Sequence, residues 1–275
     1  ANFLGQRLAL CRGENGLMPT YCRYRVKMEQ GTPSFEKCDM PLFLESSVRD
    51  MRLCESKQKR EKLFEAVHRS ELFDGKLGMY RVNQALDISE LELGRAAAFT
   101  PGWLENGSIW LHMEYKYLLE LLRGGLYEQF SETMRQAAIP FLDPAVYGRS
   151  TLENSSFLVS SMNPEEALHG RGYVARLSGS TAEFMSIWQI MMFGRKPFLR
   201  TESGVQINLQ PCIPAYLIDE ERTIRAAFME NSTVLYHFAE CRDYFPGSYS
   251  IRIQSVVDVD AIRQGVATEI VADIF

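Results

Sequence analysis

One segment restricts the fold of this chain more than any other: SIWLHMEYKYLLELLRGG, residues 108–125. Apolar and aromatic side chains fall on nearly every face of a helix drawn through it. A helix that is apolar all round must be buried on all sides, so it needs several neighbouring helices. Gly124 and Gly125 mark its end, because glycine readily adopts the left-handed conformation that closes helices. We therefore expect this helix to lie inside a larger helical assembly.

Other helical patterns surround this segment in the first two thirds of the chain. Apolar residues recur at helical spacing in four further stretches, and Ser180 and Glu183 form a capping-box pattern at the start of the last one. Residues 20–30 alternate as a strand would. The predicted helices cover residues 41–56, 56–73, 126–141 and 180–194.

The periodicity changes after Pro197 from that of helices to that of strands. Short alternating stretches separated by turn residues follow, which is typical of a small antiparallel β unit. The helices therefore come first and the strands second. The predicted strands lie within residues 204–214, 222–229, 232–240, 248–259 and 264–270.

Composition excludes several classes of partner. Thirty Lys and Arg residues against 35 Asp and Glu residues give a net charge of −5. Such a chain has no general attraction to nucleic acid or to acidic membranes. Its longest apolar runs are far shorter than a membrane span. We expect a cytoplasmic protein with reduced cysteines, bound neither to nucleic acid nor to a membrane.

Two polar segments at predicted helix starts are suited to an anion. The first, residues 100–112, contains Glu105 and Asn106 and ends at His112; the second, residues 169–184, contains Ser178 and Gly179. A helix N-terminus offers unpaired N–H groups and a partial positive charge, and histidine adds a donor. The alternative is that these residues only cap helices and that His112 is a core residue.

A third polar segment, residues 143–161, contains Arg149 and Glu153 between aromatic and apolar neighbours. Sugar sites combine aromatic surfaces with planar polar groups that bind hydroxyls in pairs. The alternative is an ordinary loop over a helical core. Neither a metal-binding motif nor a nucleotide-binding loop is present in the sequence, so we expect no metal and no cofactor.

These segments resemble the cellobiose phosphorylase group of inverting glycoside phosphorylases. PGWLENGSIWLH (101–112), ARLSGSTAEFMSIWQIMMFGRKP (175–197) and INLQPCIPAYL (207–217) are similar to three motifs of that group, in the same order. The stretch 153–184 is most similar to the β-1,3-oligoglucan phosphorylase branch. The resemblance extends from about Pro41 to the end of the chain.

The resemblance implies a fold and a division into domains. The group has an (α/α)6 barrel followed by a small β-sandwich. We therefore expect residues 1–198 to form the C-terminal part of an (α/α)6 barrel and residues 199–275 to form a small antiparallel β-sandwich domain. The resemblance also allows a homodimer.

The implied reaction is the reversible phosphorolysis of β-1,3-gluco-oligosaccharides to α-glucose 1-phosphate with inversion, phosphate being a co-substrate. A general acid protonates the glycosidic oxygen while phosphate attacks the opposite face of the sugar. The resemblance assigns phosphate binding to His112, Ser178 and Gly179. It assigns the donor sugar to Glu105, and we add the neighbouring polar residues of the first and third segments as sugar-binding candidates: Asn106, Arg149 and Glu153.

The catalytic acid itself is not among these residues. In the group it is an Asp in a Trp-Asn-Asp context, and none of Trp103, Trp110 and Trp188 precedes Asn-Asp. We therefore expect the acid upstream of this chain, in a missing N-terminal part, and expect the chain to be inactive by itself. Two alternatives stay open: an inverting glycoside hydrolase using Glu105 or Glu153 as base, and a non-catalytic carbohydrate-binding subunit.

Overall fold

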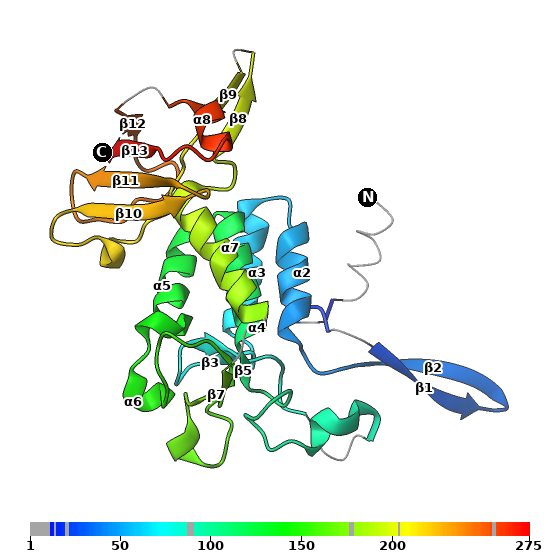
Figure 1. Ribbon diagram of the computed structural model, residues 1–275. Helices are drawn as coiled ribbons and strands as arrows, with labels where there is room; N and C mark the ends of the chain where they lie inside the picture. Colours follow the sequence, from blue (N-terminus) through cyan, green and yellow to red (C-terminus); the bar gives the residue numbers. More distant parts are fainter. Residues whose placement is uncertain are drawn as a thin grey trace. The chain divides into compact units, whose positions relative to one another are not determined.

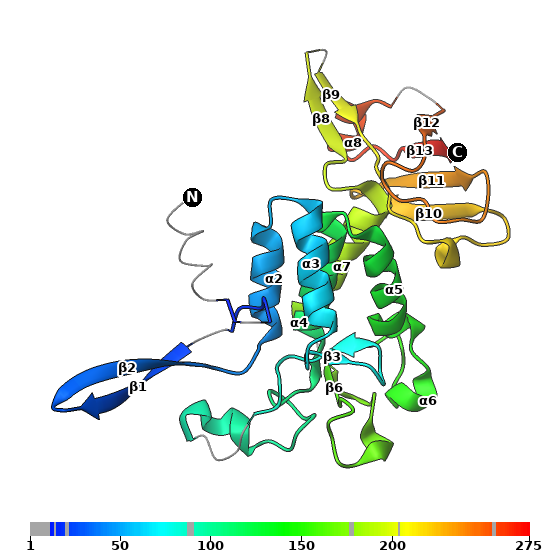
Figure 2. The same cartoon turned by 180° about the vertical axis from the view of Figure 1, so that it is seen from behind.

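The computed structural model describes residues 12–13, 15–19, 22–86, 91–175, 179–202, 204–254 and 257–275. The chain forms two compact units, Ala1–Phe184 and Met185–Phe275, and each is described by itself. Figures 1 and 2 show the elements from opposite sides.

The first unit begins with a two-stranded antiparallel hairpin, β1 (Cys22–Glu29) and β2 (Thr32–Asp39). Gln30 and Gly31 between them both have positive φ, at 49° and 83°, as two-residue hairpin turns require. Most side chains of β2 are exposed, and so are those along β1. The hairpin extends away from the helices of its unit (Figure 1).

Five helices make most of the core of the first unit. α2 (Leu44–Leu53) buries a stripe that includes Val48 and Met51, and Ser56 caps α3 (Lys57–His68) by accepting a hydrogen bond from the backbone N–H of Lys59 at 3.3 Å. α4 (Leu111–Gly124) packs along α2 and joins α5 (Tyr127–Ala137) through a short turn in which Gly125 has a φ of 79°. The fifth helix is α7 (Gly179–Phe193), of which only the first residues belong to this unit.

Small sheets and short helical turns lie between these helices along the chain. β5, β6 and β7 form a three-stranded antiparallel sheet, and β3 pairs with β4. The bounds are β3 (Phe73–Asp74), β4 (Met79–Tyr80), β5 (Ile109–Trp110), β6 (Ser155–Leu158), β7 (Gly172–Ala175), η1 (Leu91–Ala98), η2 (Ile139–Phe141), α6 (Pro144–Tyr147) and η3 (Glu166–Leu168).

The boundary between the units falls within α7. In the second unit, β10, β11, β13 and β12 form one sheet in that order, with β11 and β13 parallel. Its buried face packs on the end of α7, where the Tyr236 hydroxyl donates to the carbonyl of Met192 at 2.6 Å. The bounds are β8 (Phe198–Thr201), β9 (Gly204–Ile207), η4 (Ala215–Leu217), β10 (Thr223–Phe228), β11 (Ser232–Phe238), β12 (Ile251–Ile253), α8 (Val259–Arg263) and β13 (Glu269–Ile274).

The predicted fold class, part of an (α/α)6 barrel followed by a small antiparallel β-sandwich, is wrong. The described residues form a mixed α/β structure with thirteen strands in five small sheets. A barrel needs successive helical hairpins, whereas strands lie between α3 and α4 and again between α5 and α7. A sandwich needs two stacked sheets, whereas β10–β13 form a single sheet that contains a parallel pair.

The individual helices and strands agree with the prediction from sequence better than their arrangement does. Helices are found where the patterns predicted them, at α2, α3, α4, α5 and α7, and so are strands β1, β10 and β11. Cys38, Cys54 and Cys241 carry free thiols. Among the described residues, no helix combines the length and the apolar character needed to cross a lipid bilayer.

Candidate functional site

Two of the predicted phosphate residues meet in the structure. His112 lies on the first turn of α4, and Gly179 is the first residue of α7. A Cβ atom built on Gly179 would lie 2.3 Å from Cε1, 2.4 Å from Nδ1 and 2.5 Å from Nε2 of His112. The imidazole ring therefore rests on the Cα of Gly179, in space that any side chain would occupy.

The three-stranded sheet brings the two helix starts together. Trp110 at the end of β5 pairs with Phe157 of β6, and Ser155 at the start of β6 pairs with Ala175 at the end of β7. Because neighbouring strands are antiparallel, the chain leaves β5 and β7 at the same end of the sheet. α4 follows β5 directly, and α7 begins four residues after β7 ends. Ser178 lies outside the described residues.

Charged side chains from three helices surround the imidazole. Nε2 of His112 lies 3.6 Å from Oε1 of Glu183, which stands one turn after Gly179 on α7. Lys116, one turn after His112 on α4, pairs with Glu45 of α2 at 3.4 Å. The ring thus has a carboxylate on the α7 side and an ammonium on its own helix.

These surroundings lower the pKa of His112 below its usual value. Burial has the largest effect, and the Lys116 ammonium adds to it, while Glu183 and Glu45 act in the opposite direction. The imidazole is therefore mainly neutral near pH 7, with one N–H donor and one acceptor. A neutral donor at the start of α7, where the helix dipole gives a partial positive charge, is suited to an anion that also needs room close to the backbone.

The sequence pattern predicts a helix that is apolar on nearly every face, but α4 also carries a row of charged residues. Lys116, Glu120 and Arg123 continue the face that His112 starts, at spacings of three and four residues. Glu120 accepts hydrogen bonds from Arg52 of α2 at 2.6 Å and from Arg123 at 3.0 Å. The regular spacing of these charged residues, within a segment rich in leucine and tyrosine, is the sequence feature that indicates this polar face.

The third predicted segment reaches the same end of the sheet. Arg149 and Glu153 precede β6 and pair with each other at 3.5 Å. The neighbouring Asn154 accepts a hydrogen bond from the Tyr115 hydroxyl of α4 at 3.4 Å. This contact anchors the segment to the helix that carries His112.

Glu105 and Asn106 lie at the opposite end of the sheet, in the loop that enters β5. Glu105 pairs with Arg95 at 3.0 Å. Asn106 is fully buried, and its side chain donates to the carbonyl of Phe99 at 2.8 Å and accepts from the N–H of Leu86 at 3.2 Å. Its amide is thus occupied in holding the loop, whereas the Glu105 carboxylate is partly exposed.

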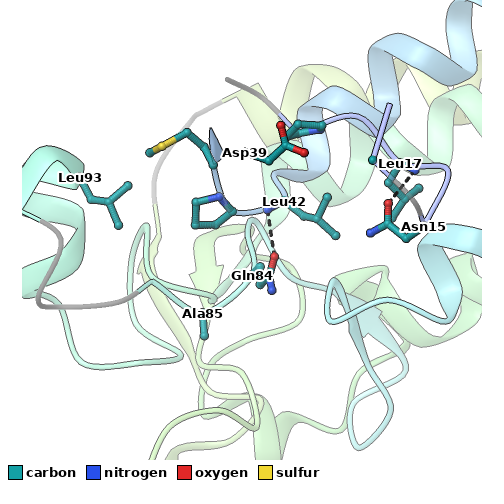
Figure 3. A pocket seen from close by; sticks show the side chains of 11 residues that line it. Asn15, Leu17, Asp39, Leu42, Gln84, Ala85 and Leu93 are labelled. Atoms are coloured by element: carbon teal, nitrogen blue, oxygen red, sulfur yellow. Dashed lines mark hydrogen bonds between the residues drawn. The ribbon is translucent and has the colours of Figure 1, made fainter. Parts of the chain in front are cut away.

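A cavity of about 580 Å³ lies elsewhere in the first unit, between the loop before α2 and the chain near Gln84 (Figure 3). Two of its polar groups are engaged with backbone: Oε1 of Gln84 accepts from the N–H of Leu42 at 3.1 Å, and Oδ1 of Asn15 from that of Leu17 at 3.0 Å. None of the predicted site residues that the structure describes lines it. The lining is Gly13, Asn15, Leu17, Pro19, Asp39, Met40, Pro41, Leu42, Gln84, Ala85 and Leu93.

The part of the chain that the structure describes contains no cluster of three or more His, Cys, Asp or Glu side chains able to hold a metal ion. Comparison with known proteins adds no relative: no family model and no curated protein matches the chain.

Proposed function

We propose that the chain carries the phosphate-binding part of an inverting glycoside phosphorylase that converts β-1,3-gluco-oligosaccharides and inorganic phosphate to α-glucose 1-phosphate. One observation carries the proposal: the His112 ring rests on the Cα of Gly179. The two segments that the sequence indicates as anion sites, at the starts of α4 and α7, thereby contribute to one site.

In the proposed reaction, phosphate is held by the His112 imidazole at the start of α7. One phosphate oxygen attacks C1 of the glucosyl residue, and the bond between C1 and the glycosidic oxygen breaks. The leaving oxygen takes a proton from a general acid, an Asp supplied from outside these residues. Holding phosphate in one orientation beside the sugar removes much of the entropic cost of the encounter.

The sugar would lie on the side of the site formed by the segment before β6. Asn154 joins that segment to α4, and the paired Arg149 and Glu153 offer planar polar groups to hydroxyls. Glu105 remains a candidate for a more distant sugar contact.

The test has two steps. Binding of inorganic phosphate to the chain is measured by calorimetry for the unchanged protein and for His112→Ala, which is expected to lose binding. Release of glucose 1-phosphate from laminaribiose is then assayed with the chain and, where its gene encodes residues before Ala1, with the longer protein. Glucose released without phosphate would indicate a hydrolase. Sugar binding with no turnover in either form would indicate a binding subunit.

A further inference from the structure

One face of the β1–β2 hairpin is apolar and exposed. The register places Val26 directly opposite Phe35. Residues opposite each other in an antiparallel pair lie on the same face of a sheet, as do residues two positions apart along one strand. Among the described residues, this apolar face carries four large side chains with more than half of their surface exposed: Tyr24 at 61%, Val26 at 56%, Met28 at 67% and Phe35 at 66%. A contiguous exposed patch of this kind is typical of an interaction surface.

The other face of the hairpin is charged. Arg25 lies opposite Glu36, and Lys27 pairs with the same carboxylate at 2.8 Å. This face is therefore suited to water. A two-stranded hairpin by itself is at best marginally stable, and a third strand or a packed apolar face is needed to stabilise it. The ribbon thus gains stability when its apolar face is covered.

The charges on the apolar face balance within the described residues. Lys37 lies opposite Tyr24, and its ammonium pairs at 2.8 Å with Asp39, two positions further along the same face. Two such faces can therefore meet without electrostatic repulsion. An acidic lipid surface is a poorer occupant, because the chain has a net charge of −5 and the cations Arg25 and Lys27 lie on the other face of the ribbon.

The exposed area is sufficient for a second copy of the chain. The four large side chains expose roughly 500 Å² in one copy, so that two apolar faces in contact would bury about 1,000 Å², the lower limit of a specific interface. An identical copy offers an equal area and an equally balanced charge. Two-fold dimers are also the commonest oligomers of soluble proteins.

We propose that the apolar face of the β1–β2 hairpin is the interface of a two-fold dimer of this chain. The hairpin extends from the helices of its unit (Figures 1 and 2). Antiparallel stacking of two hairpins, each turn towards the base of the other, keeps the two sets of helices apart. Val26 then lies near the two-fold axis, and Tyr24 lies close to Met28 of the partner subunit, where sulfur and ring attract each other. The dimer does not depend on the proposed phosphate site.

Sedimentation equilibrium of the 275-residue chain tests this interface. The unchanged chain is expected to dimerise with a Kd of about 10 µM. Val26→Lys places two ammonium groups next to each other at the axis and is expected to weaken the dimer at least thirtyfold, as an order of magnitude. Arg25→Ser, at the adjacent position on the charged face, is the matched control and should keep the Kd within about threefold. Both positions are exposed, so the melting temperature of the helices should not change.

A mixing experiment tests the antiparallel arrangement. Val26→Glu and Val26→Lys are each expected to be monomeric, whereas their mixture should form a heterodimer because opposite charges meet at the axis. A mixture that stays monomeric overturns this arrangement.

The remaining outcomes decide the interface itself. An unchanged chain that is monomeric at about 200 µM overturns the dimer, and co-sedimentation of that monomer with phosphatidylcholine vesicles would assign the apolar face to lipid. A dimer that persists in the folded Val26→Lys protein also overturns the proposal, because its interface must then lie elsewhere.

Discussion

Gly179 and His112 are in contact because the glycine has no side chain. The backbone of Gly179 is helical, so alanine there causes no strain in φ and would by itself favour the helix. Its Cβ would nevertheless overlap the ring, 2.3 Å from Cε1. Gly179→Ala is therefore expected to retain the fold, to displace the imidazole and to weaken phosphate binding about tenfold or more, as measured by calorimetry.

Gly124→Ala is the matched control for this prediction. Gly124 also belongs to a helix, but an added Cβ would meet Cδ of Arg60, at 2.8 Å, in a flexible side chain. We expect phosphate binding to be unchanged. Equal affinities of Gly179→Ala and the unchanged chain would mean that His112 does not need its present position.

Glu114 is expected to make the stability of the protein depend on pH. This carboxyl is completely buried on α4; Oε2 accepts from the N–H of Tyr80 at 3.0 Å, while Oε1 has no hydrogen-bond partner within the described residues. Burial raises the pKa of Glu114 from its model-peptide value of 4.5 to about 8. The folded state therefore holds a proton that the unfolded state has lost between those two values. Stability is greatest below the lower value and falls by about 1.4 kcal/mol per pH unit towards the upper one.

Glu114→Gln removes this titration and keeps an acceptor for the Tyr80 N–H. Urea unfolding at several pH values between 5 and 9 should show a weaker decline for the variant than for the unchanged chain, with the variant more stable at the alkaline end. Glu128→Gln, at an exposed position on α5, is the control and should follow the unchanged chain. Parallel curves for Glu114→Gln and the unchanged chain would contradict the prediction.

Asp74 is expected to be essential for stability. Its buried carboxylate accepts from both the N–H and the hydroxyl of Ser161, each at 2.7 Å, and lies 3.4 Å from the guanidinium of Arg81. Asp74→Ala leaves these groups unpaired in the interior, which costs about 3 kcal/mol in the free energy of unfolding. Asp143→Ala, which removes an exposed helix cap on α6, should cost only about 1 kcal/mol in the same urea titration. A smaller loss for Asp74→Ala than for Asp143→Ala would be inconsistent with this role.

Asn106 and Glu105 are adjacent, yet their substitution should have different effects. Asn106→Ala removes two hydrogen bonds from a fully buried amide, and we expect unfolding to become easier by about 2 kcal/mol. Glu105→Gln weakens a partly exposed ion pair with Arg95, and we expect a change within about 0.5 kcal/mol. If Glu105 contacts the sugar, only Glu105→Gln should weaken laminaribiose binding at unchanged melting temperature. A fully stable Asn106→Ala protein would contradict the structural role of the amide.

The elements that could be predicted from sequence are those with strong local signals. α3 has a Ser56 cap and a charged face, α4 is followed by the capping residue Gly125, and β11 buries every second residue. β6 and β7 have only four residues each and exist because they pair with each other and with β5. The parallel pairing of β11 with β13 joins strands separated by β12 and α8. Local periodicity carries no information on such distant pairing, so the predicted architecture was wrong although its elements were found.

The candidate site was likewise predictable only in part from the sequence. His112 and Gly179 were chosen for the chemistry of their segments, but their contact depends on the register of β5, β6 and β7, which no local pattern indicates. Glu183 was interpreted only as part of a capping box. Its position beside the imidazole follows from helical spacing once the contact between Gly179 and His112 is known.

The hairpin of β1 and β2 gives this protein a practical point of attachment. Its turn at Gln30 and Gly31 lies at the tip of a ribbon that extends from the helices (Figure 2), and exposed loop tips tolerate inserted sequence. A short epitope or a fluorophore-labelling sequence placed between these two residues would leave α4 and α7 untouched. Binding of oxyanions could then be followed on immobilised protein, with the attachment far along the chain from His112.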